Sequence, residues 1–149
     1  MDTLAKPKYD HDFVSWSDHQ AELLRQGRVH ELDLENLAEE VEDIGRSQRS
    51  AVESELSIIL IHLLKHQFQP SKRSRSWVDT LLEHRGRLVK DFSVSRSLEL
   101  HAEAELADLY RLSRKRAAVQ TRLPLETFPE TCPYTLTQTL DEDFLPEGS

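Results

Sequence analysis

Two histidines, His62 and His66, are the residues whose type and spacing best suit chemistry. On a helix they would lie one turn apart, so both imidazoles could bind a single metal ion. Further ligands would have to come from facing helices, where the candidates by residue type are Glu83, His84, His101, Glu103 and Asp108. The pair therefore raises the hypothesis of a metal-binding protein or a metal-dependent enzyme.

The apolar sequence around these histidines offers a simpler explanation. Seven apolar side chains lie between Leu56 and Leu64, and burying them contributes on the order of 10 to 20 kcal/mol before opposing contributions are subtracted. Burying one neutral, hydrogen-bonded imidazole costs about 1 to 3 kcal/mol. Such a helix would bury His62 with or without a function. We therefore favour a structural role for the histidines and keep the metal site as the alternative.

The sequence motifs of common enzyme classes are absent from the 149 residues. There is no Glu-x-x-His pair of the di-iron bundles, and no HExxH, GxSxG, phosphate-binding loop or dinucleotide-binding fingerprint. Cys132 lies in a proline-containing tail with no residue identifiable as its base. We therefore predict no catalytic residue and no cofactor, and we lean away from an enzyme.

Basic residues gather in the segment Lys72 to Trp77, where they alternate with serine and precede a tryptophan. Lys72, Arg73 and Arg75 could contact phosphate, and the tryptophan could stack on a base. The same residues suit an ordinary loop before a helix, and the formal net charge of -8 argues against general nucleic-acid binding. The loop is our main interpretation, with phosphate or nucleic-acid contact as the alternative.

One very long helix, predicted from Asp33 to Gln69, would position the histidines. Its second half, Leu56 to Leu64, is apolar on every side and must be surrounded, whereas its first half carries an apolar stripe that should pack against one neighbour. At 1.5 Å per residue the helix would be roughly 55 Å long, which exceeds a compact domain of this size. It should therefore bend around Gly45 to Ser47, or project and find a partner. The stripe consists of Leu34, Leu37, Val41 and Ile44.

Charge is unevenly distributed along the chain. Residues Glu31 to Glu55 include nine acidic and two basic side chains, whereas Lys65 to Lys90 include seven basic and two acidic ones. The two segments could pair inside one bundle or across two copies of the chain.

The other elements are shorter. A first helix is predicted between Asp12, its N-cap, and Gly27, which ends it. A third helix is predicted to begin at Ser74 or Ser76, because Ser76 to Asp79 has the spacing of a capping box. A serine-rich turn, Ser93 to Ser97, leads to a fourth helix.

The C-terminal segment, Leu123 to Pro146, contains four prolines among apolar residues. It should lie extended over the core, with one short helix from about Thr135 to Leu140. We expect residues 1–9 to be a flexible tail and residues 10–146 a single helical domain. The predicted fold class is all-α: a bundle of about four helices around one long central helix, closed by an extended proline-containing strap.

Composition also bears on location. The single cysteine, Cys132, fits a reducing compartment. The first residues lack the apolar core of a signal peptide, and the apolar run Leu56 to Leu64 is too short to cross a bilayer. We expect a cytoplasmic protein that has no membrane partner.

Four sequence segments carry a resemblance to a known family. They are LDLENLAEEVEDIGRS at 32–47, HLLK at 62–65, RSRSW at 73–77 and FPETCPY at 128–134. They resemble a bacterial family known as domain of unknown function 29, and the resemblance spans about Tyr9 to Pro146. It implies a small helical domain with a proline-containing tail, and it supplies no activity, cofactor or catalytic residue.

Taken together, these patterns favour a non-enzymatic interaction or assembly module. The overlong second helix and the charge-partitioned surface predict a homo-oligomer, or a complex with another protein. The competing hypothesis is the metal-binding protein or enzyme built on His62 and His66.

Overall fold

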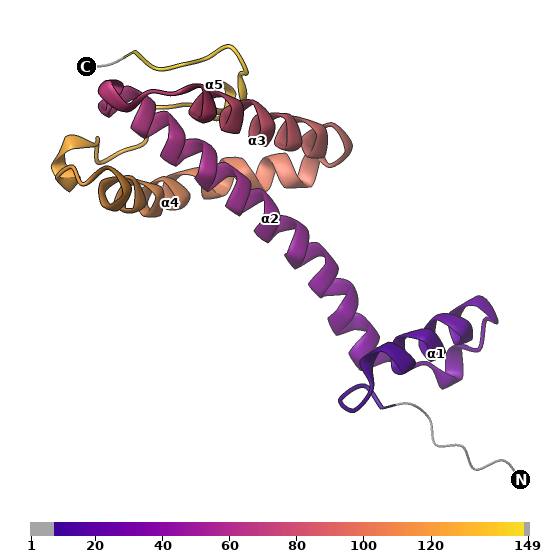
Figure 1. Cartoon of the computed structure of the whole chain (residues 1–149). Helices are drawn as coiled ribbons and strands as arrows, with labels where there is room; N and C mark the ends of the chain where they lie inside the picture. The colour runs from indigo at the N-terminus through magenta and orange to yellow at the C-terminus, as the bar shows by residue number, and fades with distance from the viewer. Residues whose placement is uncertain (1–7, 148–149) are drawn as a thin grey trace, which may run out of the picture. The chain divides into compact units, whose positions relative to one another are not determined.

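The structure, a computed structural model, describes residues 8–147 and contains five α-helices and no strand in that range. The all-α fold class is confirmed. Residues 1–7 of the predicted N-terminal tail lie outside the described residues. The helices, labelled in Figure 1, are α1 (Phe13–Arg25), α2 (Leu34–Phe68), α3 (Arg75–Val94), α4 (Arg96–Thr121) and α5 (Leu136–Leu140).

Residue contacts divide the chain into two compact units, Met1–Arg46 and Ser47–Ser149. The division falls inside α2, which is one helix of 35 residues as predicted. Its helical structure continues through Gly45 to Ser47.

The first unit has a small core between α1 and the beginning of α2. Asp12 caps α1 by accepting a hydrogen bond from Ser15 N at 3.1 Å, and Gly27 follows the helix with a positive φ of 69°. The predictions for the two ends of α1 are therefore confirmed. Trp16 of α1 donates its indole N–H to Asp33, just before α2, at 3.0 Å. Within residues 8–46 the buried apolar side chains are Trp16 and Leu23.

The second unit surrounds the apolar half of α2. Lys65 lies over the Trp77 ring, and Glu55 pairs with His84 farther along the chain, so α3 runs antiparallel to α2. The side chains that α2 buries there are Val52, Leu56, Ile59, Leu60, Ile61, Leu63 and Leu64, each at most 5% exposed. The prediction that this half must be surrounded is confirmed, and the chain itself supplies the covering.

The fourth helix runs parallel to α2. Glu53 pairs with His101 near the start of α4, and Lys65 bonds Gln120 near its end. The turn between α3 and α4 is a single residue, Ser95, whose side chain accepts a hydrogen bond from Leu98 N and so caps α4.

The N-cap of α3 is Ser74, whose hydroxyl accepts a hydrogen bond from Trp77 N. Of the two predicted capping residues, Ser74 is right and Ser76 is wrong. Ser76 lies within the first turn of α3, and its hydroxyl lies 2.9 Å from that of Ser74, while the amide that Ser74 caps is that of Trp77.

The C-terminal strap covers this bundle as predicted. Phe128 and Tyr134 are buried, and Thr135 forms a capping box with Gln138 at the start of α5. Arg85, 1% exposed, donates to the backbone carbonyl of Thr139 at 2.8 Å and so ties α3 to the end of α5. Burial lowers the pKa of Arg85, but the guanidinium remains charged.

Candidate functional site

The predicted histidine pair lies on the half of α2 that the second unit covers. His62 is half-buried with its Nδ1 at 2.9 Å from the carbonyl of Ile58, and His66 is buried with its Nδ1 at 3.3 Å from the carbonyl of Pro146. A carbonyl only accepts, so each Nδ1 carries the proton and each Nε2 keeps its lone pair. Burial is the main cause that lowers the pKa of both imidazoles. Both are therefore neutral near pH 7.

The other potential ligands have different partners. His84 pairs with Glu55, and His101 Nε2 lies 2.8 Å from Glu53 Oε2. In the part of the chain that the structure describes, no three His, Cys, Asp or Glu side chains form a group that could hold a metal ion. A metal role for His62 and His66 stays a prediction.

The predicted phosphate-contacting residues lie between α2 and α3. Arg73 donates from Nε to the carbonyl of His66 at 2.7 Å, which satisfies one of the last carbonyls of α2. Lys72 and Arg75 are exposed. His66, Arg73 and Arg75 line one groove of about 570 Å³ with Val78 and Leu82. Contact with phosphate or nucleic acid stays a prediction.

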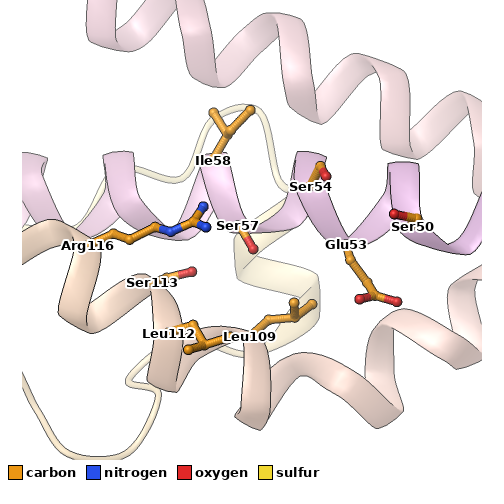
Figure 2. Close-up of a pocket in the computed structure, with 9 residues that line it drawn as sticks. All are labelled: Ser50, Glu53, Ser54, Ser57, Ile58, Leu109, Leu112, Ser113 and Arg116. Atoms are coloured by element: carbon orange, nitrogen blue, oxygen red, sulfur yellow. The ribbon is translucent and has the colours of Figure 1, made fainter.

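The structure also contains a cleft that the sequence analysis missed, which we call the serine cleft. It has a volume of about 300 Å³ and lies between α2 and α4 (Figure 2). The periodicity of the serines on α2 was visible in the sequence, but their position opposite α4 depends on tertiary packing. The lining residues are Ser50, Glu53, Ser54, Ser57, Ile58, Leu109, Leu112, Ser113 and Arg116.

A second feature is the apolar stripe at the start of α2, consisting of Leu34, Leu37, Val41 and Ile44, which we call the α2 stripe. Leu34, Val41 and Ile44 are 64%, 66% and 63% exposed, and Leu37 is half-buried. The sequence predicted that this stripe packs against one neighbour, and within this chain three of its four members are left uncovered. The neighbouring small core of Trp16 and Leu23 is too limited to cover them.

Among residues 8–147, the ion pairs between the acidic and basic segments are those of Glu55. Glu55 pairs with Arg87 at 3.2 Å as well as with His84. In the first unit, Arg46 pairs with Glu42 and Asp43 on its own helix.

No helix of residues 8–147 is both long enough and apolar enough to cross a membrane. The family described as "Domain of unknown function DUF29" matches residues 8–145, which is nearly the whole chain. No curated protein and no solved structure gives a match.

Proposed function

We propose that this chain, which belongs to the DUF29 family of unknown function, is a non-enzymatic assembly module whose copies associate through the α2 stripe. The observation that carries the proposal is the exposure of Leu34, Val41 and Ile44, each about two-thirds open to solvent in a well-formed helix. A contiguous exposed apolar patch on a soluble domain is typical of an interaction site.

The spacing of the stripe favours a second helix as the partner. Leu34, Leu37, Val41 and Ile44 recur at intervals of three and four residues, which are the a and d positions of two successive heptads. The flanking e positions are Ala38 and Gly45, and both are small enough to allow a close approach.

The charges beside the stripe are compatible with a second copy of the same helix. The acidic residues Glu35, Glu39, Glu42 and Asp43 fall at b, c and f positions, which face away from a coiled-coil seam. Glu40 falls at a g position, but it accepts a hydrogen bond from the Tyr9 hydroxyl. In a parallel pair, where g positions face e positions, Glu40 of one copy faces Gly45 of the other, so apolar side chains come together without opposing carboxylates.

Aromatic side chains extend the apolar surface next to the stripe. The rings of Tyr9, Phe13 and Trp16 pack against one another in edge-to-face and tilted arrangements, with centroids 4.8 to 5.7 Å apart. Bonds from Tyr9 to Glu40 and from Trp16 to Asp33 hold this cluster on the flank of α2. Phe13 is 47% exposed, so it is available to a partner helix.

The apolar gain and the cost of association are of similar size, so a complex formed through the α2 stripe is expected to be reversible. Covering one of the three exposed stripe side chains contributes about 1 to 2 kcal/mol, and a symmetric pair covers each of them twice, for about 6 to 12 kcal/mol. Association costs about 4 to 15 kcal/mol in lost freedom, so burial of Phe13 has to add to the gain. We expect a dimer with a Kd of about 1 to 100 μM.

Light scattering from about 1 to 500 μM tests this proposal. The molar mass should rise from monomer to dimer over this range, and Val41→Glu with Ile44→Glu should leave a monomer throughout. The control is Val119→Glu, at a valine on α4 that is 79% exposed, and this variant should dimerise like the unmodified protein. A monomer at every concentration, or a dimer that the double substitution leaves intact, would refute the proposal.

A metal-binding function through His62 and His66 is the second candidate. It is supported by the two Nδ1 atoms, which bond carbonyls and leave both Nε2 atoms as potential ligands. Elemental analysis of untagged protein tests it. Stoichiometric zinc, manganese or iron that is lost in His62→Ala would favour this function over the assembly module.

We also propose a location in the bacterial cytoplasm. The support is Cys132, a half-buried free thiol whose pKa is raised by burial, which suits a compartment where thiols stay reduced. A reporter domain fused to the C-terminus, with a signal that differs between the cytoplasm and the space outside the inner membrane, would test this location.

A further inference from the structure

We propose that the serine cleft binds a small zwitterion of the amino-acid class, with its carboxylate at Arg116 and its ammonium group at Glu53. The cleft lies within the second unit, so this site is independent of the α2 stripe. Its volume of about 300 Å³ lies at the lower end of the range for small-molecule sites.

The first observation is a buried hydroxyl without a partner. Ser113 is 1% exposed, and its Oγ has no hydrogen-bond partner among residues 8–147. A buried hydroxyl in this state is costly, and such groups are commonly kept for a function. Figure 2 shows Ser113 and Ser57 facing each other across the space between α4 and α2.

The other cleft serines also lack the local bonds that helical hydroxyls commonly make. Elsewhere in this chain, Ser17, Thr80 and Thr121 each donate to a carbonyl in the preceding turn. In the described part of the chain no such bond is made by the hydroxyls that line the cleft, those of Ser50, Ser54, Ser57 and Ser113. The cleft therefore offers a row of hydroxyls available to a bound molecule.

Opposite charges lie at the two ends of this row. Arg116, an exposed residue, extends into the cleft from α4 (Figure 2) and makes no ion pair or hydrogen bond with residues 8–147. Glu53 is held from one side, since His101 Nε2 lies 2.8 Å from its Oε2. This contact orients the carboxylate and leaves Oε1 for a second donor.

The class of ligand follows from this order of groups. A guanidinium prefers a carboxylate, a carboxylate oxygen prefers an ammonium, and the hydroxyls can bond either group. Ile58, Leu109 and Leu112 supply an apolar wall for a short side chain. An amino acid presents these features together, whereas a simple anion would leave Oε1 of Glu53 without a donor and a simple cation would leave Arg116 unpaired.

Titrations followed by amide NMR spectra test the proposal, with glycine, L-serine, L-leucine and L-glutamate as probes. At least one should give saturable shifts confined to residues 50–58 and 109–116. Butyrate and butylamine, which each lack one of the two charged groups, should bind about tenfold more weakly or not at all, because each loses one charge-assisted contact.

Substitutions test which residues of the cleft bind the two charged groups of the ligand. Arg116→Gln and Glu53→Gln should each weaken binding about tenfold, while Arg111→Gln, an exposed arginine on the same helix and outside the cleft, should leave it unchanged. The proposal is overturned if none of the four amino acids saturates, if butyrate binds as tightly as the best of them, or if Arg116→Gln has no effect.

Ser113→Ala separates a binding role from a packing role. Removing an unpartnered buried hydroxyl should raise the melting temperature of the ligand-free protein, and it should weaken binding of the best probe at least threefold. A higher melting temperature with undiminished binding would remove Ser113 from the site.

Discussion

The two halves of α2 belong to one unbroken helix, yet their apolar side chains have different surroundings. Leu60 and Leu64 in the second half are fully buried by α3, α4 and the strap, whereas Val41 and Ile44 in the first half are about two-thirds exposed. The comparison separates two uses of apolar surface. The second half stabilises the fold, and the first half is the surface that the proposed assembly would use.

The largest expected effect is a difference in stability between the halves. Leu60→Ala removes a fully buried side chain and should lower the free energy of unfolding by about 3 kcal/mol. Ile44→Ala removes an exposed one and should change it by less than about 0.5 kcal/mol at concentrations where the protein is monomeric. Urea denaturation measures both, and equal losses would mean that the first half is covered within the monomer.

Substitutions at two glycines, one in each unit, should change the stability by smaller amounts. Gly86 lies in α3 with open space around its Cα, so Gly86→Ala should stabilise the protein by about 0.5 to 1 kcal/mol. Gly27 has a φ of +69°, so Gly27→Ala should destabilise the end of α1 by about 1 kcal/mol. Hydrogen exchange can locate each change, and stabilisation by Gly27→Ala would contradict the left-handed turn.

Low pH should reduce the stability of the second unit, because protonation of its buried histidine His66 opposes folding. The pKa of His66 is lowered by burial and by the charge of Arg73, so the unfolded state binds a proton more readily than the folded state. Stability should therefore fall as the pH drops below about 6.5 and approaches the folded-state pKa. His66→Gln should flatten this dependence in denaturation curves recorded between pH 5 and 8. An unchanged slope would show that His66 titrates freely in the folded protein.

The smallest expected effect is that of salt on association. An apolar seam should hold its dissociation constant within about threefold between 0.05 and 1 M sodium chloride, since little charge is paired across it. Association through the acidic and basic segments would instead weaken several-fold with salt. Repeating the light-scattering series at both salt concentrations distinguishes the two surfaces.

Much of the fold could be predicted because its signals are local. Asp12 and Gly27 delimit α1 through backbone chemistry that the neighbouring sequence specifies, and the spacing of the prolines left room for the short helix α5. The N-cap of α3 was less predictable, because Ser74 and Ser76 both have a hydroxyl that can accept a hydrogen bond from a backbone amide, and they are only two residues apart.

The candidate sites were less predictable because they depend on which helices face one another. The sequence singled out His62 and His66 by their spacing, but their carbonyl partners come from Ile58 and from Pro146, which is 80 residues from His66. The serine cleft combines the serines of α2 with Ser113 and Arg116 of α4. The amphipathic pattern of the α2 stripe predicted a covered face, and such a pattern does not distinguish a partner within the chain from one outside it.

The measurement that tests the assembly proposal most directly is an isotope-filtered NOE experiment. The sample is an equal mixture of methyl-labelled and unlabelled protein at high concentration. The proposal predicts contacts between copies from the methyl groups of Leu34, Val41 and Ile44. Contacts that arise only from exposed methyl groups of the second unit, such as those of Val94 and Val119, or no contacts between copies at all, would contradict it.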